Sequence, residues 1–547
     1  AARWPARALK QAWRPLLQQQ AHDSICGCST DAVHREMVQR FASLAQRLDA
    51  LHAHALAAAG MVGLRRHAAG PDVWADDAHC TVFNPLPQGL AGWQVLQIFL
   101  RGERHAALRV MHGAQACPHV LLQAVAHEEI RSPLDDFPER LQGWRYELAL
   151  PLALPGLGAM ALEIQAVAPP DGAGSSPPDA PGPSCASAWR IENAALAIWL
   201  DAEGVLLLSD RASGATHAPL MQWLHELDAG DSYNWSPPPE PGAPILASLH
   251  RRAVRQLGPA SELHLGITME VPVGLSPDRR GAVTERVRNE GQLRLRLLGD
   301  EAVVHAELVW HNRARDQRTR LLLPLASAQA PVWTDTAFAW TARAPVCRRV
   351  PETLSRQEMP VAVFPTASAL HADPWWLAHE AMHECEVVEQ AGRPFLALTL
   401  VRSVGWLSRR DLLTRGVGAG PDIATPEAQC LGTEVFRWRF GPGSAPQALQ
   451  QARLLRRPAR LLRGHGAHWS APVELGNAEV VVSSTRRLGA DGALELRVWN
   501  PTARTQALTL TTAHWAAVRA DGTPLPESAQ ATHAVPPHAL LTLRSIA

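Results

Sequence analysis

Two residue types are almost missing from this chain of 547 residues: lysine occurs once, at Lys10, and tyrosine twice, at Tyr146 and Tyr233. A phosphate-binding loop that ends in Gly-Lys-Ser/Thr is therefore excluded, because Lys10 follows Leu9. An enzyme that forms a Schiff base would have to use Lys10, which lies in a polar, helix-like stretch without a visible catalytic partner. The scarcity of lysine therefore argues against both phosphate-binding-loop proteins and Schiff-base enzymes.

An excess of charge is also lacking, since 52 Lys and Arg residues balance 52 Asp and Glu residues. Without a net positive field, we expect no nucleic-acid partner and no attraction to an anionic membrane surface. The most apolar stretch, 148–167, is interrupted by Pro151, Pro155, Gly156 and Gly158, so it predicts no membrane-spanning helix. A hydrophobic content of 46% and a charged content of 19% indicate a folded globular chain.

Cysteine is sparse, with eight residues and no Cys-x-x-Cys pair, which favours a reduced, cytoplasmic setting over a disulfide framework. Cys26-Gly27-Cys28 is too close for a typical zinc knuckle and is interpreted as small loop residues. No secretory signal is visible in the first twenty residues. The chain begins at Ala1 without an initiator methionine, so we expect it to be a fragment of a longer protein.

Only the first sixty residues have a strong helical pattern. An apolar stripe at three- and four-residue steps predicts a helix that Ser29 or Thr30 caps and Gly60 ends. The stripe consists of Val33, Met37, Phe41, Leu44, Leu48, Leu51 and Ala55. A shorter helix is expected over about 7–20, and the loop 21–29 joins the two helices.

After Pro71 the pattern changes to strands. Residues 293–297 and 304–310 alternate in polarity around a turn at Gly299-Asp300, which predicts a hairpin. Similar runs continue to the end, so the expected fold class is mainly β, with antiparallel sandwiches after a helical segment. The expected division is a helical segment 1–70, a small β domain 71–167, a linker 168–185, a large β-sandwich 186–440 and a C-terminal β domain 441–547. A helix over about 445–462 would blur the last boundary.

The segment His379-Glu380-Ala381-Met382-His383 fits the zinc-binding pattern of metallopeptidases, in which a helix presents both imidazoles on one face. However, residues 385–388 and 395–401 predict a hairpin with a turn at Ala391-Gly392, which leaves little room for a long helix. The pattern favours a packing role for both histidines, and a zinc metallopeptidase is kept as an alternative.

His22 and Asp23 lie side by side in the loop between the two predicted helices. A neutral imidazole and a carboxylate are good zinc ligands or hydroxyl-binding groups, and Gly27 would let the backbone bend so that both face a cavity. The pair can equally cap or pack a helix end. The residue types alone leave both interpretations open.

The stretch QAHDSICGCSTDAVH, 20–34, closely resembles the His-Asp loop of glycoside hydrolase family 38 α-mannosidases of the bacterial type. Further segments resemble the family in the expected order, so the resemblance covers most of the chain from Trp13 to Phe440. These segments are 82–87, 191–193, 208–214, 228–237 (DAGDSYNWSP), 312–320, 364–365, 400–415 and 419–432 (AGPDIATPEAQCLG).

The resemblance implies a retaining α-mannosidase with one zinc ion and a large sandwich of the mutarotase-like type. It implies that His22 is a zinc ligand, that Asp23 binds sugar hydroxyls and that Tyr233 lies near the bound mannose. Asp231, in the loop of Tyr233, is a further substrate-binding candidate. The resemblance also places an arginine near the sugar, either Arg409 or Arg410, without distinguishing them.

The family's N-terminal α/β barrel, which supplies a His-x-Asp pair of zinc ligands, the nucleophile and the general acid, has no counterpart in this chain. A retaining mechanism needs two carboxyl groups about 5–5.5 Å apart. We therefore expect the C-terminal portion of the enzyme, inactive as a fragment and without a catalytic residue of its own. Its expected partner is a mannose-containing carbohydrate, and homo-oligomerisation stays open. The alternative is a non-catalytic carbohydrate-binding or scaffold protein.

Overall fold

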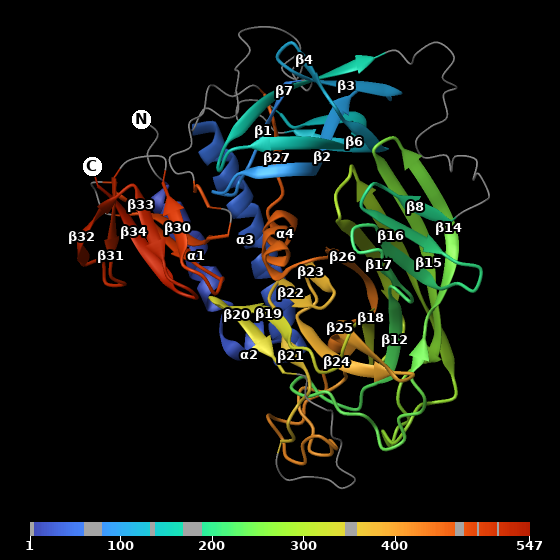
Figure 1. Cartoon of the computed structure of the whole chain (residues 1–547). Helices are drawn as coiled ribbons and strands as arrows, with labels where there is room; N and C mark the ends of the chain where they lie inside the picture. The colour runs from blue at the N-terminus through green and yellow to red at the C-terminus, as the bar shows by residue number, and fades with distance from the viewer. Residues whose placement is uncertain are drawn as a thin grey trace.

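The computed structural model describes residues 5–58, 79–131, 137–167, 189–344, 358–464, 475–477, 479–488, 492–510 and 514–546. Helices dominate only the first of these ranges, and strands dominate the others (Figure 1). All pairings between the named strands of the described residues are antiparallel. The predicted class, mainly β after a helical segment, is confirmed. The predicted linker, 168–185, lies outside the described residues.

The helical segment consists of α1 (Ala6–Gln18), α2 (His22–Ile25) and α3 (Asp31–Ala58). The Gln19 side chain donates a hydrogen bond of 3.1 Å to the carbonyl of Met37, which ties the end of α1 to α3. Met37 and Leu44 are buried as the stripe predicts, whereas Val33 and Leu48 are 39% and 41% exposed. The buried residue at the far end of the stripe is Leu56 and not Ala55. Leu56 packs against Phe83 of the first strand, so contact with the next domain decides the register there.

The small β domain contains two sheets. The first is formed by β1 (His79–Phe83), β3 (Ala107–His112), β4 (Gln115–Cys117), β7 (Ala159–Val167) and β27 (Arg460–Arg463). The second is formed by β2 (Leu90–Arg101), β5 (Val120–Arg131) and β6 (Glu139–Leu154). Strand β27 pairs with β1 although about 380 residues separate them, so this domain draws a strand from the segment after the large sandwich. The hydrophobic core of this domain includes the buried residues Val82, Val110 and Leu162.

The large sandwich has three sheets in the described residues. The four-stranded sheet comprises β8 (Arg190–Glu192), β9 (Leu196–Leu200), β10 (Leu206–Asp210) and β11 (Thr216–His217). The six-stranded sheet comprises β12 (Gln222–Leu227), β13 (Ile245–Leu246), β18 (Gln317–Pro324), β21 (Phe364–Pro365), β24 (Glu384–Gln390) and β25 (Arg393–Ser403). The nine-stranded sheet comprises β14 (Ser248–Leu257), β15 (Ala260–Pro272), β16 (Arg286–Leu298), β17 (Val304–Asn312), β19 (Val332–Thr336), β20 (Ala339–Arg343), β22 (Ala369–Ala372), β23 (Trp375–His379) and β26 (Gly432–Pro442).

The predicted hairpin 293–310 is present as β16 and β17, with Leu295 opposite Ala306. Its inward residues join one core in which Trp310 and Trp438 are almost completely buried. Burying each large apolar side chain contributes roughly 1.5–3 kcal/mol, so this core can hold long exposed loops in place at its edges. Those loops carry Asp231, Tyr233, Arg409 and Arg410.

The segment after β26 begins with α4 (Ala445–Arg456), which covers part of the helix predicted over 445–462. Ser444 and Gln447 form a capping box at its start, and α4 packs on β22 and β23. The C-terminal domain then has one sheet of β28 (Val481–Arg487), β29 (Leu494–Trp499), β31 (His514–Val518), β32 (Pro524–Gln530) and β34 (Leu540–Ile546). The pair β30 (Gln506–Thr509) and β33 (Thr532–Val535) faces it across a shared core.

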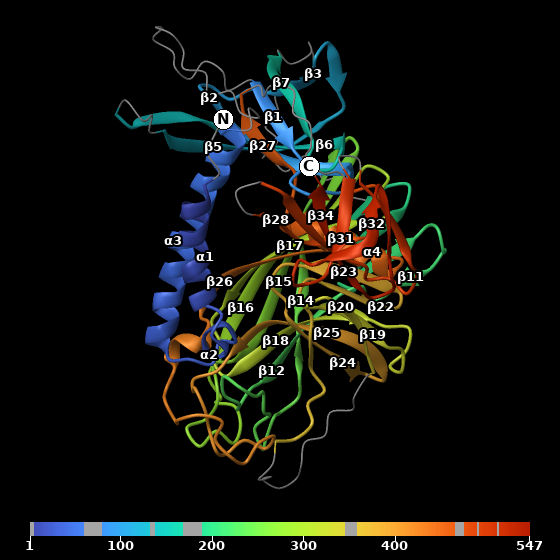
Figure 2. The ribbon, with the colours of Figure 1, turned by 90° about the vertical axis from the view of Figure 1, so that its left-hand side faces the viewer.

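Helix α3 runs along one side of the molecule, from the small β domain to the loops of the large sandwich (Figure 2). With 28 residues, it is about 42 Å long. Leu56 fixes one end on the small β domain, and the other end meets the short 3₁₀ helix η1 (Pro426–Gln429) of the sandwich. No described helix combines the length and the apolar character that a membrane span needs.

Candidate functional site

The His-Asp loop is a compact turn between α1 and α3. Gly27 adopts a φ of 78°, which an L-residue with a side chain rarely takes, and this lets the chain reverse after α2. The carbonyl of Asp23 then accepts hydrogen bonds from the Cys28 amide at 3.1 Å and the Ser29 hydroxyl at 2.8 Å. The backbone of the loop is therefore well fixed although it lies at the surface.

The side chains of His22 and Asp23 point outward from this fixed backbone. His22 Nε2 lies 3.2 Å from Asp23 Oδ1, and the two side chains are 88% and 58% exposed. Cys28 Sγ lies 3.8 Å from the same carboxylate oxygen. An imidazole and a carboxylate are thus held next to each other in a position that a ligand can reach.

Tyr233 reaches this loop from the large sandwich, more than 200 residues further along the chain. Its hydroxyl donates a hydrogen bond to the Cys28 sulfur. Burial raises the pKa of the Tyr233 phenol, and the nearby Cys28 and Asp23 raise it further, so the phenol stays neutral and able to donate. A Cβ atom on Gly420 would lie 3.1 Å from the Tyr233 hydroxyl oxygen, so only glycine leaves the ring its present space. The structure therefore brings His22, Asp23 and Tyr233 together.

Asp231 is fully buried beneath Tyr233. Its Oδ1 accepts hydrogen bonds from the backbone amides of Tyr233 and Asn234, both at 3.0 Å, and its Oδ2 accepts one from the Arg409 amide at 2.7 Å. Oδ2 is also ion-paired with the buried Arg415. This placement favours a role in shaping the loop over the direct sugar contact that we predicted for Asp231.

Neither predicted arginine lies against Tyr233 in the described contacts. Arg409 forms a bidentate ion pair with Asp411 and lies over the ring of Trp406, 4.6 Å from its centroid. Arg410 is 72% exposed, with Nε 3.6 Å from Asp422 Oδ2.

The guanidinium that does approach Tyr233 belongs to Arg415, 5.7 Å from the ring centroid. Its Nε donates to the carbonyl of Val417 at 2.8 Å, and its other nitrogens contact Asn234 and Asp231. Arg415 therefore joins the loop of Tyr233 to the loop after β25.

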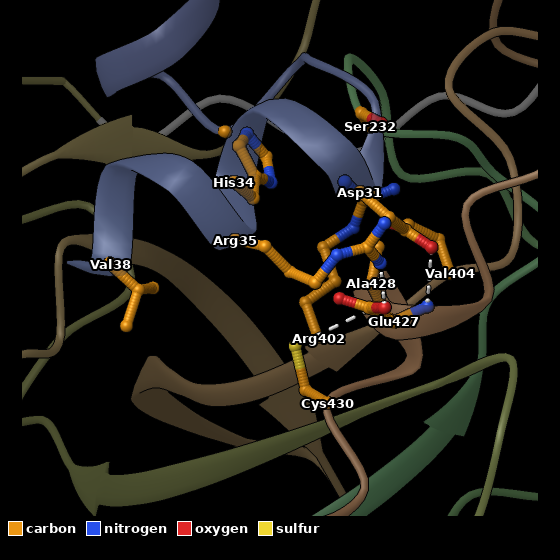
Figure 3. Close-up of a pocket in the computed structure, with 11 residues that line it drawn as sticks. Asp31, His34, Arg35, Val38, Ser232, Arg402, Val404, Glu427, Ala428 and Cys430 are labelled. Carbon is orange, nitrogen blue, oxygen red and sulfur yellow. Dashed lines mark hydrogen bonds and ion pairs between the residues drawn. The ribbon is translucent and has the colours of Figure 1, made fainter. Parts of the chain in front are cut away.

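A cleft of about 710 Å³ opens beside the His-Asp loop, between the start of α3 and the sandwich (Figure 3). Arg35 of α3 forms an ion pair with Glu427 across it, and Asp31 accepts a hydrogen bond of 3.0 Å from the Glu427 amide. On the sandwich side, Arg402 donates to Asp228 Oδ2 at 2.7 Å and to the carbonyl of Asn234 at 2.6 Å. The contacts of Asp31 and Arg35 fix the helical segment against η1, and those of Arg402 hold the loop that carries Tyr233.

The described residues do not hold a complete metal site. Nowhere in them do three or more His, Cys, Asp or Glu side chains gather in a way that could bind an ion. Zinc sites normally use about three or four protein ligands. The exposed imidazole of His22 fits as one ligand, and the remaining ligands would have to come from outside the described part of the chain.

The metallopeptidase alternative is wrong. His379 is the last residue of β23, and β24 begins at Glu384, so the motif does not form a helix. His379 is fully buried, and both of its ring nitrogens are in use: Nδ1 accepts from the Met382 amide at 3.3 Å, and Nε2 lies 3.1 Å from the Thr366 hydroxyl. Burial lowers the pKa of His379 to about 3. The predicted hairpin after the motif is present as β24 and β25 and explains why no helix forms.

Sequence reasoning missed Arg415 and Cys28. Arg415 lies within a segment that resembles the family, but the resemblance indicates Arg409 or Arg410, and sequence spacing does not reveal which guanidinium turns inward. Cys28 was interpreted as a small loop residue. Its place between Asp23 and Tyr233 depends on a contact between distant segments, which no local pattern encodes.

Comparison with protein-family models matches residues 1–58 to the α-mannosidase middle domain. Over 29 residues, the chain is 66% identical to a protein of Halalkalibacterium halodurans named "Putative mannosylglycerate hydrolase". That stretch is 5% of this chain and 3% of the relative.

Two solved structures match the whole chain. One is an α-mannosidase from Enterococcus faecalis V583, with a TM-score of 0.80 and 18% identity, of which the match covers 64%. The other is a protein in glycosyl hydrolase family 38 from Enterococcus faecalis, with a TM-score of 0.78 and 18% identity, of which the match covers 66%. The chain therefore spans less than two thirds of each relative. The predicted resemblance to family 38 is confirmed by these matches, and the fold is the one that these two proteins share.

Proposed function

We propose that this chain is the helical and β-sandwich part of a zinc-dependent, retaining α-mannosidase and that it is inactive by itself. One observation carries the proposal: the exposed His22–Asp23 pair and the neutral phenol of Tyr233 meet at one surface, although they come from different domains. A site between domains is a common location for substrate binding. The similarity of the first 58 residues to an α-mannosidase domain supports the same conclusion.

Each of the three side chains has a distinct part in this proposal. The Asp23 carboxylate accepts hydrogen bonds from sugar hydroxyls, and the Tyr233 hydroxyl turns from Cys28 to donate to a sugar oxygen. His22 offers its imidazole to zinc. When bound, the ion supplies a positive charge that orients the mannose hydroxyls and favours the distorted, oxocarbenium-like transition state.

Inactivity of the chain alone follows from the number of carboxylates at this surface. A retaining glycosidase needs one carboxyl group as nucleophile and a second as acid and then base. Asp23 is exposed there, whereas Asp231 is buried and bonded to Arg415 and three backbone amides. The two catalytic carboxyl groups are therefore assigned to a part of the enzyme outside this chain.

The test compares this chain with the product of its gene including any coding sequence upstream of Ala1. The longer product should release nitrophenol from 4-nitrophenyl α-mannoside, lose this activity with a chelator and regain it with zinc. His22→Ala in the longer product should abolish activity, and Asp23→Asn should reduce kcat/KM by about a hundredfold or more. The 547-residue chain should show no hydrolysis.

Two outcomes would contradict the proposal. Full zinc-dependent activity in the His22→Ala variant would refute the ligand assignment, and hydrolysis by the 547-residue chain would refute the assignment of the carboxyl groups. Saccharide binding without hydrolysis by the longer product would favour the non-catalytic carbohydrate-binding alternative. Mannosylglycerate should be assayed beside the aryl mannoside, because the name of one relative specifies that substrate.

A further inference from the structure

A second cleft, of about 800 Å³, lies in the large sandwich and is lined entirely by described residues. Its wall is a proline-rich segment that contains Pro237, Pro238, Pro239, Pro241 and Pro244. We call it the proline-walled cleft. Its volume falls within the range of about 300–1,000 Å³ that is typical of small-molecule sites. Because proline backbones lose little conformational freedom on binding, the wall is already ordered for a ligand.

Polar groups of three kinds line the cleft between these apolar walls. Glu226 is largely buried, and its Oε2 is held by Arg318 at 3.0 Å and by Arg320 at 2.7 Å. Arg286 is exposed and donates one hydrogen bond, to the carbonyl of Glu270. His225 is 2% exposed, and its Nε2 has no hydrogen-bond partner.

His225 contributes to the shape of the cleft rather than to hydrogen bonding with a ligand, because its unpartnered Nε2 has almost no accessible surface. Burial lowers the pKa of His225 to about 4, so the ring is neutral at ordinary pH. The hydrogen-bonding side chains that a ligand in the cleft can reach are therefore Glu226 and Arg286.

The chemistry of the cleft selects the class of ligand. An apolar ligand would remove water from Glu226 and Arg286 without replacing the lost hydrogen bonds. A charged ligand of either sign would meet a like charge, since a carboxylate and a guanidinium both line the cleft. A neutral molecule with C–H faces for the prolines and Trp235, and hydroxyls for the polar groups, meets every requirement. A saccharide has this composition.

Trp235 gives the cleft an aromatic surface with a fixed position. Its ring lies over the Arg318 guanidinium, 4.5 Å from the centroid, and its carbonyl accepts a hydrogen bond of 3.0 Å from the Thr414 hydroxyl. Arg318 is completely buried, so the stacking partner does not move. An aromatic ring held in this way needs no reorganisation to pack against a sugar ring.

We propose that the proline-walled cleft is a binding site for a neutral saccharide, separate from the surface formed by His22, Asp23 and Tyr233. The site needs no hydrolysis and no metal, and it is complete within this chain. Trp235 and Tyr233 belong to one loop, and Leu413 of the cleft accompanies Arg415 on the other loop. A saccharide in the cleft would therefore hold both loops that shape the candidate active site.

The experiment measures binding of an α-1,6-linked mannotriose to the 547-residue chain by isothermal titration, with saturation-transfer NMR to identify the bound rings. We expect saturable binding with a Kd of about 0.1–1 mM. Trp235→Ala should weaken it at least about tenfold, and Arg286→Ala about threefold. Arg286 is exposed, so its variant tests the site even if loss of Trp235 disturbs the loop. Arg280→Ala, an exposed arginine paired with Glu240, is the matched control and should keep wild-type affinity.

Absence of saturable binding, or equal affinity in Arg286→Ala and the wild type, would overturn the proposal. Affinity that falls in Tyr233→Phe but not in Arg286→Ala would locate the saccharide at the His-Asp loop and would also overturn it. A proline-rich peptide is the second probe, and binding of this peptide alone would assign the cleft to a different ligand. Failure of the mannosidase proposal would not affect any of these measurements.

Discussion

The two sides of the candidate active site are built in opposite ways. On the sandwich side, Asp231 and Arg415 are buried, and the carboxylate oxygens of Asp231 are satisfied by the guanidinium and by backbone amides. On the helical side, His22 and Asp23 have a fixed backbone but exposed side chains. The sandwich side therefore satisfies its charged groups within this chain, whereas the helical side leaves an imidazole and a carboxylate exposed. In the proposed enzyme, the zinc ion and the further catalytic groups would join the site on the helical side.

Loss of the buried carboxylate should have the largest effect. Asp231→Ala leaves the Arg415 guanidinium buried and unpaired, which costs about 3–5 kcal/mol of unfolding free energy in comparable pairs. Urea unfolding of the sandwich transition would measure it. Asp411→Ala is the matched control, because it removes the half-exposed partner of Arg409 and should cost about 1 kcal/mol or less. Equal losses in the two variants would show that the buried network is not the stronger side.

The buried His379 should make the free energy of unfolding depend on pH. The pKa of His379 in the folded state is about 3, below the usual 6.5, because the ring is buried. Below pH 6.5 the unfolded chain therefore takes up a proton that the folded chain does not, so stability is full above pH 6.5 and declines as the pH falls towards 3. The slope from this residue is roughly 1.4 kcal/mol per pH unit.

Unfolding in urea between pH 7 and pH 4 tests this expectation. His379→Gln should be less stable at neutral pH, because packing is lost, but should depend less steeply on acid than the wild type. An unchanged slope in His379→Gln would contradict the prediction.

The turn of the His-Asp loop should show an intermediate effect. Gly27→Ala places a side chain at a φ of 78°, which costs about 1–2 kcal/mol, although the new methyl group meets no neighbour within 4 Å. The turn should loosen, and the buried Cys28 thiol should react faster with a thiol reagent. Ser24→Ala, within α2, is the control and should leave the reaction rate unchanged. Unaltered Cys28 reactivity in Gly27→Ala would show that this glycine does not hold the loop.

The contact between the two sides should contribute least to stability. Arg35→Ala removes an exposed ion pair with Glu427, which is worth about 1 kcal/mol or less. Its effect should appear instead as faster amide exchange at the start of α3. Glu36→Ala breaks the Arg40–Glu36 pair within the same helix and should not produce this change. A double-mutant cycle between Arg35 and Glu427 would measure the coupling directly.

The sequence predicted those parts of the fold that repeat locally. The helix α3 and the hairpin of β16 and β17 are both present, although only part of the apolar stripe of α3 is buried. Two features depend on contacts between distant segments: the burial of Leu56 in place of Ala55, and the pairing of β27 with β1. The residues of the candidate site also fall into a group predicted from the sequence and a group that only the structure reveals. The resemblance predicted His22, Asp23 and Tyr233, which the structure brings together, but only the folded chain distinguishes the inward Arg415 from the outward Arg409 and Arg410.

Helix α3 is long enough to turn a small rotation at one end into a large displacement at the other. It is about 42 Å long, with Leu56 seated on the small β domain and Asp31 beside the His-Asp loop. A tilt of about 5° around Leu56 would displace Asp31 by about 3 Å, which is comparable to the length of a hydrogen bond. The ion pair between Arg35 and Glu427 lies near the end of α3 that is far from Leu56, where it opposes such a tilt. Although this ion pair contributes little free energy, its distance from Leu56 makes it effective in holding the direction of the helix.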